Sequence, residues 1–173
     1  MKTLVVVNPQ SANASTGREW PEIRAGLKTA LGDFDEAFTQ GRGDATSMVS
    51  RALSGGTQRI IAVGGDGTNN EVVNGFFRDG EPIAPDACLG LVPRGTGGDL
   101  RKTFGLGREL ERCIPVLKAG KLQDVDLGMT RFVDGQGLKV QRLFINITSF
   151  GIGGLVDHLV NRSTKALGGK ASF

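Results

Sequence analysis

The chain has 173 residues and a net charge of +3, a length that fits one domain burying about 70% of its unfolded surface. So small a positive charge, with no long basic run and interleaved aromatics, argues against a nucleic-acid partner. No apolar run approaches the ~20 residues of a membrane span, and no signal peptide is visible, so we expect a cytoplasmic protein. Cys88 and Cys113 lack metal-ligand spacing and fit reduced, buried thiols.

Apolar runs and helical patterns alternate through the first 120 residues. The apolar spacing predicts strands at 3–7, 34–38, 60–63 and 88–92, and helices near 19–31, 44–53, 99–104 and 108–119, with one more that begins within 69–71. Asp44 can cap the second helix, and Pro115 should kink or shorten the last one. Strands alternating with helices at this spacing predict an α/β fold with a doubly wound, mostly parallel sheet.

The pattern changes after Gly120. Two extended runs, 125–133 and 138–148, are joined by Asp134-Gly135-Gln136-Gly137, which predicts a β-hairpin. A glycine turn and a helix are expected at 151–161, and the chain is polar from Arg162 onward. We therefore expect one domain over 1–161, followed by a linker or the start of a further domain over 162–173.

Glycine is more than twice as frequent as the usual ~7%, with 27 residues concentrated in turn motifs. The most informative motif follows the strand at 60–63 and reads Gly64-Gly65-Asp66-Gly67-Thr68. Glycines let backbone N–H groups approach a bulky anion, and Gly65 is expected at positive φ or against phosphate. A strand, a glycine turn and a helix N-terminus together predict a phosphate site.

A second strand-turn-helix unit follows the strand at 88–92. It reads Pro93-Arg94-Gly95-Thr96-Gly97-Gly98-Asp99, with a hydroxyl at Thr96 and a helix start at Asp99. Parallel strands place both turns at one edge of the sheet, where α/β proteins bind ligands. Other nucleotide motifs fail: there is no P-loop, and the glycine pattern at 151–156 has Val156 in the third glycine's place.

These motifs resemble a known family. Gly64 to Thr68 is the signature shared by diacylglycerol kinases, sphingosine kinases, NAD kinases and, in variant form, phosphofructokinases. Four further segments are similar to the diacylglycerol-kinase type of catalytic domain: Asn8-Pro9, Pro93 to Leu100, Val125 to Gly128, and Phe144-Ile145-Asn146 with Gly151. The resemblance runs from Lys2 to about Leu167.

The resemblance implies the N-terminal, ATP-binding domain of a lipid kinase, which moves the γ-phosphate of ATP onto a lipid hydroxyl, most simply that of diacylglycerol, at a membrane surface. It implies ATP and Mg²⁺ as cofactors and a carboxylate network around the metal formed by Asp66, Asp99 and Asp126. The ATP contacts it implies are Asn8, Thr39, Gly64, Gly65, Asp66, Gly67, Thr68, Asn69, Asn70, Glu71 and Thr96.

The chain departs from the family pattern in two motifs. Gly98 stands where the family usually has Asn, and the glycine of the first motif is displaced or absent. Family members also have a second, β-rich domain that supplies the general base, a Glu after Asp-Gly, whereas Asp134-Gly135 is followed here by Gln136.

We therefore expect the first domain alone, inactive by itself. The side chains expected to be left uncovered, and to favour self-association such as a homodimer, are Phe132, Leu143, Phe150 and Phe173. An NAD kinase-like phosphotransferase and a catalytically silent nucleotide-binding module remain the alternatives.

Overall fold

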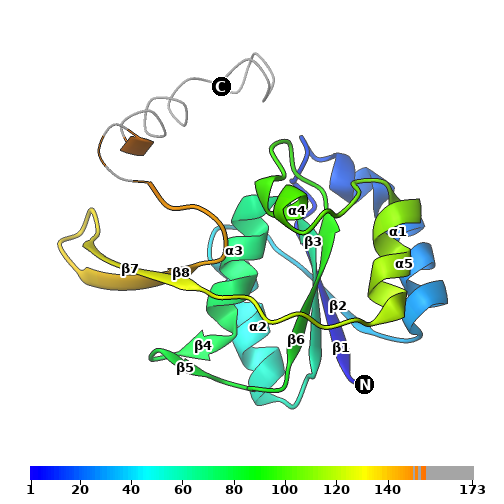
Figure 1. Cartoon of the computed structure of the whole chain (residues 1–173), viewed down its shortest axis with the longest axis horizontal. Coiled ribbons are helices and arrows are strands. Elements are labelled where there is room, and N and C mark those ends of the chain that lie inside the picture. The colour runs from blue at the N-terminus through cyan, green and yellow to red at the C-terminus, as the bar shows by residue number, and fades with distance from the viewer. Residues whose placement is uncertain (150, 152, 155–173) are drawn as a thin grey trace.

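Four parallel strands form the centre of the molecule, in the order β2-β1-β3-β6 (Figure 1). The computed structural model describes residues 1–149, 151, 153 and 154. The strands of the sheet are β1 (Thr3–Val7), β2 (Asp35–Phe38), β3 (Arg59–Gly64) and β6 (Cys88–Pro93). β1 and β3 are buried on both faces because helices cover each side, which is why they read as continuous apolar runs.

Helices cover both faces of the sheet, so the fold is the doubly wound α/β class that the sequence predicts (Figure 1). α1 (Ser15–Leu31) and α5 (Leu110–Ala119) pack on one face, where Val5 and Val7 point. α2 (Asp44–Ser54) and α3 (Asp66–Gly75) pack on the other, where Val6 points. Side chains alternate between faces along a strand, so adjacent valines supply two separate cores.

A short helix, α4 (Asp99–Thr103), lies at the carboxyl edge of the sheet, just beyond the end of β6 (Figure 1). Leu100 anchors it, because that side chain is buried in the core that α2 and α3 share. The loops after β3 and β6 meet at this edge, where Gly65 lies against Gly95, and this is the edge where the sequence places both glycine motifs.

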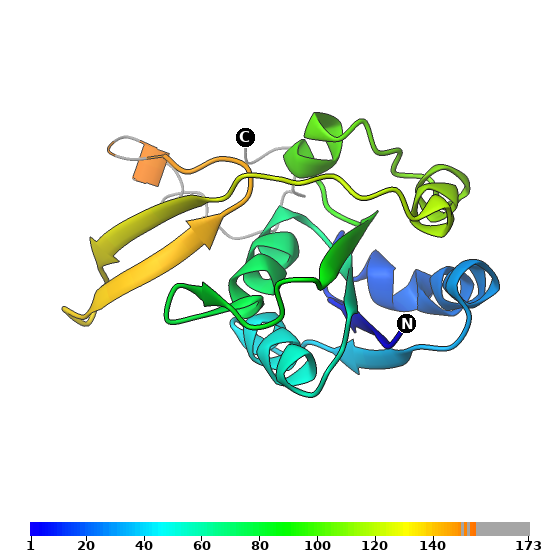
Figure 2. The same cartoon turned by 60° about the horizontal axis from the view of Figure 1, so that its bottom comes forward.

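The predicted hairpin is present as the antiparallel pair β7 (Gly128–Val133) and β8 (Lys139–Phe144). It stands apart from the central sheet in both views, beyond α3 (Figures 1 and 2). Phe132 is 44% exposed as expected, but the prediction for Leu143 is wrong: only 9% of this residue is exposed, because β8 packs against α3 there. Phe150 and Phe173 lie outside the described residues.

Two local expectations differ from the structure, and one pair of strands was not expected at all. α3 begins at Asp66, not within 69–71. The predicted start was too late because the first turn of the helix is polar and carries no apolar periodicity. Asp44 does not cap α2: Gly43 is the N-cap, and the Asp44 carboxylate accepts hydrogen bonds from the preceding N–H groups of Gln40 and Gly41. A two-stranded pair, β4 (Phe77–Arg78) and β5 (Glu81–Pro82), was not predicted.

Most of the helix expected at 151–161, and all of 162–173, lie outside the described residues. Within the part of the chain that is described, no helix combines the length and the apolar character needed to cross a bilayer. Pro115 lies inside α5, whose ten residues begin at Leu110, two positions after the predicted start.

Candidate functional site

The two glycine loops touch through their backbones. A Cβ on Gly65 would lie 3.1 Å from the Cα of Gly95, and a Cβ on Gly95 would lie 2.7 Å from the Cα of Gly65. The N–H of Arg94 also donates to the carbonyl of Gly64 at 2.7 Å. Gly65 has φ −94°, so the expected positive φ is wrong. Glycine is needed at this position because the second loop leaves almost no room for a side chain.

Asp66 joins the first loop to the N-terminus of α4. Its Oδ2 accepts from the N–H of Gly98 at 3.0 Å and of Asp99 at 3.3 Å, and its Oδ1 accepts from the N–H of Leu100 at 3.2 Å. These N–H groups are the ones that a helix N-terminus leaves without an intrahelical partner. The carboxylate therefore caps α4 from a different element and fixes the position of the second loop.

The carboxylate of Asp99, unlike that of Asp66, pairs with the side chain of Lys102. Its Oδ1 accepts from Lys102 at 2.7 Å, and both side chains are more than half exposed. Asp126 is exposed in the extended segment between α5 and β7. Among the described residues, no hydrogen bond connects Asp126 to Asp66 or Asp99. The structure thus brings Asp66 and Asp99 together through the backbone of α4.

The loop after β1 is attached to the first turn of α3. Asn8 donates from Nδ2 to the hydroxyl of Thr68 at 3.0 Å, and its Oδ1 accepts from the N–H of Gln10 at 3.0 Å. The N–H of Asn8 donates to the carbonyl of Val63 at 2.9 Å. Three loops, after β1, β3 and β6, are thereby fixed against one another at the carboxyl edge of the sheet.

Asn69 carries a buried polar atom that nothing in the described structure satisfies. The residue is 5% exposed, and its Oδ1 has no hydrogen-bond partner among the described residues. A buried polar group without a partner costs about 1–3 kcal/mol. Two residues before it, Gly67 is exposed, and a Cβ there would have no neighbour within 4 Å. The first turn of α3 therefore combines an accessible backbone with an unsatisfied acceptor.

The remaining predicted site residues are placed as follows. Thr39 directly follows β2 and donates its N–H to the carbonyl of Val7 at 2.9 Å, so it lies at the same edge. Thr96 is exposed in the second loop. Asn70 and Glu71 are half-buried in α3, and the carbonyl of Glu71 accepts from the hydroxyl of Thr46 at 2.8 Å.

Arg94 is a site residue that the sequence analysis did not single out. Its guanidinium pairs with the carboxylate of Glu19 on α1 at 2.9 Å. The Arg94 side chain is only 12% exposed, and its Nε has no hydrogen-bond partner among the described residues. The positive charge of Arg94 also acts on Cys113 of α5: burial raises the pKa of the Cys113 thiol, and Arg94 opposes that shift. A charged residue directly after a buried strand was the only signal that could have identified Arg94.

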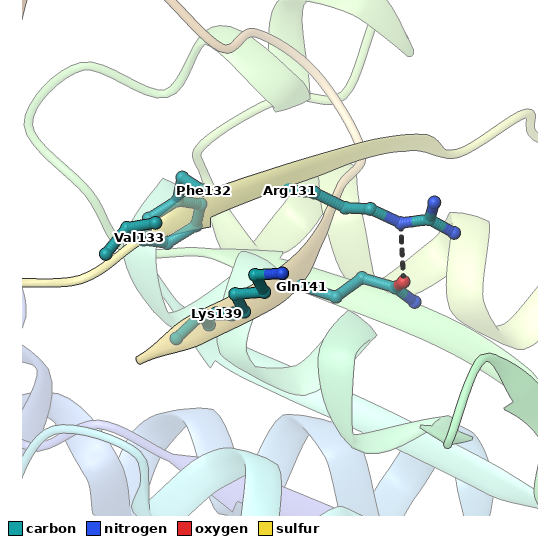
Figure 3. Close-up of a pocket in the computed structure, with 6 residues that line it drawn as sticks. Arg131, Phe132, Val133, Lys139 and Gln141 are labelled. Carbon is teal, nitrogen blue, oxygen red and sulfur yellow. Dashed lines mark hydrogen bonds between the residues drawn. The ribbon is translucent and has the colours of Figure 1, made fainter. Parts of the chain in front are cut away.

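A hollow of about 390 Å³ lies elsewhere, on the face of the β7–β8 hairpin (Figure 3). Arg131 donates from Nε to Oε1 of Gln141 at 3.2 Å across it. Six residues of the two strands line it, and no loop at the carboxyl edge contributes: Arg131, Phe132, Val133, Lys139, Val140 and Gln141.

Comparison with known proteins shows which family the chain resembles. Residues 2–130 match the family model of the diacylglycerol kinase catalytic domain. Over 147 residues, which cover 85% of the chain, it is 31% identical to a diacylglycerol kinase of Staphylococcus saprophyticus and 33% identical to one of Staphylococcus epidermidis. The chain spans 44% and 42% of the length of those two relatives.

A solved structure agrees with the sequence matches. The crystal structure of a diacylglycerol kinase from Bacillus anthracis str. Sterne superposes with a TM-score of 0.63 and 26% identity, covering 75% of this chain and 43% of that one. The matched family region, 2–130, includes both glycine loops and the segment that carries Asp126. The chain therefore belongs to the diacylglycerol kinase catalytic domain family.

Proposed function

We propose that this chain is the nucleotide-binding part of an ATP-dependent lipid kinase that transfers the γ-phosphate of ATP to a lipid hydroxyl, most simply that of diacylglycerol. The observation that carries the proposal is the backbone contact between Gly65 and Gly95, because it assembles two glycine loops at one sheet edge. Family membership, shown by the match over 2–130, supports a kinase. Phosphoryl transfer depends mainly on positioning and charge stabilisation, which such loops supply.

The residues present fit a nucleotide. The first turn of α3 offers the dipole and free N–H groups that favour a phosphate, and the unsatisfied Oδ1 of Asn69 offers an acceptor. In this proposal Asn8, Thr39, Thr96 and the segment 64–71 contact ATP.

Magnesium fits the same edge of the sheet. Among the described residues there is no group of three acidic, histidine or cysteine side chains that could hold a metal alone. Mg²⁺ in kinases is typically bound through one or two carboxylates together with substrate phosphates. Asp66 and Asp99 are the carboxylates at this edge that could share the ion with a nucleotide. When bound, Mg²⁺ neutralises charge on the phosphates, while Asp66 keeps the second loop in place.

The lipid site and the general base belong, in this proposal, to a part of the protein that corresponds to the unmatched half of the relatives. The matched region covers less than half of each relative's length. We propose the domain boundary near residue 161, with 162–173 as a linker or the start of that second part. Acting on a lipid would place the protein at a membrane surface, without a need for a membrane-spanning segment.

The test begins with nucleotide binding to the full 173-residue chain. Isothermal titration with a nonhydrolysable ATP analogue and Mg²⁺ should detect weak binding, and Asp66→Ala should weaken it. Lys28→Ala, a charge change on α1 far along the chain from either loop, is the control. A folded wild-type chain that shows no binding at millimolar analogue would refute the proposal.

Phosphoryl transfer is measured next, with radiolabelled ATP, Mg²⁺ and either diacylglycerol micelles or NAD as the acceptor. The chain alone should transfer almost nothing, and a version extended through the downstream reading frame should phosphorylate the lipid. Formation of NADP would instead support the NAD kinase alternative. Binding without transfer by the extended protein would support a silent nucleotide-binding module.

A further inference from the structure

The tip of the β7–β8 hairpin presents apolar side chains to solvent. Val133, the last residue of β7, is 63% exposed, Leu138, just before β8, is 59% exposed, and Phe132 is 44% exposed. They lie beside the turn, at the opposite end of the hairpin from Leu143, where β8 packs against α3. A group of exposed apolar side chains, unlike one that stands alone, indicates an interaction surface.

Hydrogen bonds within the turn hold this tip in one shape. Oδ1 of Asp134 accepts from the N–H groups of Gln136 and Leu138, both at 2.9 Å. The N–H of Asp134 donates to the carbonyl of Leu138 at 2.9 Å, and Gly137 has a positive φ of +81°. Because the turn is already ordered, the tip can bind a partner without a large loss of conformational freedom.

Positive charge surrounds the apolar tip. Residues 128–144 contain the three cations Arg131, Lys139 and Arg142 against the single carboxylate of Asp134, a net charge of +2 out of +3 for the whole chain. All three cations are exposed, and none forms an ion pair within the part of the chain that the structure describes. The charge of the hairpin is therefore available to an anionic partner.

An anionic lipid bilayer fits this arrangement better than a second copy of the chain. At a bilayer surface, apolar side chains enter the interface while cations stay at the level of the anionic headgroups. The hairpin has the same order: Arg131 lies farther from the turn than Val133, and Lys139 lies farther from it than Leu138. Two copies that met at this tip would bring four such cations together, and like charges oppose association.

We propose that the tip of the β7–β8 hairpin is a membrane-docking surface. Phe132, Val133 and Leu138 enter the interface of an anionic bilayer, and Arg131 and Lys139 bind its headgroups. The proposal rests on the proposed lipid kinase function, because an enzyme that acts on a membrane lipid must reach the bilayer, and it assigns that contact to one element. Since β8 packs against α3, the docked hairpin stays connected to the domain that carries the glycine loops.

Cosedimentation with vesicles tests the docking surface. The full 173-residue chain should bind vesicles of equal parts phosphatidylglycerol and phosphatidylcholine. It should bind pure phosphatidylcholine about 10-fold more weakly, and added salt should weaken the binding to anionic vesicles. The double variant Val133→Ser/Leu138→Ser should bind anionic vesicles about 10-fold more weakly, because it removes apolar surface from the tip. Arg131→Gln and Lys139→Gln should each cost about 5-fold, the factor for one basic residue near an anionic surface.

Matched variants outside the tip control for a general loss of apolar or charged surface. Leu122→Ser replaces a leucine that is 78% exposed in the segment before β7, and Lys28→Gln removes a cation from α1. Each should change vesicle binding less than about 2-fold, since screening limits the effect of distant charges. Thermal unfolding checks that every variant is folded, and the exposed tip residues should be replaceable without a change in the melting temperature.

A tryptophan at the tip separates insertion from adsorption by charge alone. In Val133→Trp, vesicles that contain brominated phosphatidylglycerol should quench the emission of the new side chain. Trp20 is the one tryptophan of the natural sequence and is 9% exposed in the core, so the wild-type chain should not be quenched and is the control. Vesicle-bound Val133→Trp whose emission is not quenched would overturn insertion of the tip.

The outcomes distinguish this surface from the nucleotide function. Vesicle binding that is equal in wild type and in Val133→Ser/Leu138→Ser overturns the docking surface, whereas titration with the ATP analogue tests the nucleotide site independently. A folded wild-type chain that binds the vesicles but not the analogue supports the surface and refutes the nucleotide function. Self-association that the double variant abolishes, without vesicle binding, overturns the membrane contact and identifies a second copy as the partner.

Discussion

Asn74 and Leu143, 69 positions apart, pair as neighbouring residues of two strands would. The side-chain amide of Asn74 donates to the carbonyl of Leu143 at 2.9 Å and accepts from its N–H at 3.0 Å. The same amide nitrogen donates to the carbonyl of Asn70, one turn back in α3, at 2.8 Å. One helical side chain thus takes the place of an edge strand and holds β8 against α3.

Replacing Asn74 with Ala should detach the hairpin from α3. The loss leaves the half-buried backbone of Leu143 without its partners, so the free energy of unfolding should fall by about 1–3 kcal/mol. Hydrogen exchange measured by NMR should show faster exchange at the Leu143 amide. Asn70→Ala, on the same helix, is the control and should leave that amide protected. Unchanged exchange at Leu143 in Asn74→Ala would contradict the assigned role.

Removing the Asp66 carboxylate should loosen the second loop. Asp66→Ala takes the acceptor away from the N–H of the N-cap Gly98 and from the first two N–H groups of α4. We therefore expect a loss of about 1–2 kcal/mol in unfolding free energy. Exchange should accelerate at the amides of Gly98, Asp99 and Leu100, while the circular dichroism stays close to that of wild type. Asp99→Ala, which breaks only an exposed ion pair, should cost less than about 0.5 kcal/mol. Equal effects of both variants would show that Asp66 does not cap α4.

The two glycines on either side of Asp66 should respond in opposite directions to alanine. Gly65→Ala pushes a methyl group against the Gly95 backbone and should destabilise the fold by about 1–3 kcal/mol. Gly67→Ala places its methyl group in open space within a helix and should be neutral or stabilising by up to about 1 kcal/mol. Urea denaturation measures both. A Gly65→Ala variant as stable as wild type would mean that the two loops do not touch.

Cys113 should make the fold sensitive to high pH. Burial raises the pKa of its thiol above the ordinary value of 9.0, so the folded state holds this proton more tightly than the unfolded state. The stabilisation is complete below about pH 9 and is lost as pH rises toward the folded pKa. Urea titrations at pH 8 and pH 10 should show a larger loss in wild type than in Cys113→Ala. Rapid alkylation of Cys113 in the native protein at pH 8 would argue against a buried thiol.

Local patterns in the sequence predicted much of the fold. Apolar runs such as Thr3–Val7 reveal strands buried on both faces, so the parallel sheet and its class followed directly. The start of α3 at Asp66 was missed because polar residues form its first turn, and periodicity detects only the apolar face. The β4–β5 pair was missed since two-residue strands are too short to show alternation.

The sequence predicted where the candidate site lies in the fold, but it did not predict which residues contact one another there. The glycine spacing located both loops at one edge, whereas the need for Gly65 came from the distant backbone of Gly95, not from its own φ. Likewise, no spacing rule indicates that Asp66 caps a helix 33 residues later. Asn74 acquires its role from Leu143, a partner that only the folded chain brings close.

The ten residues of α3 connect the glycine loops at the edge of the sheet to the β7–β8 hairpin. Its first residue, Asp66, holds the loop that carries the proposed phosphate contacts, and its penultimate residue, Asn74, holds the hairpin. A helix of this length spans about 15 Å and behaves as a stiff rod, so a small tilt at one end must displace the other. A partner that binds the hairpin and moves it would therefore also displace the glycine loops. Conversely, a ligand bound in those loops would change the orientation of the hairpin.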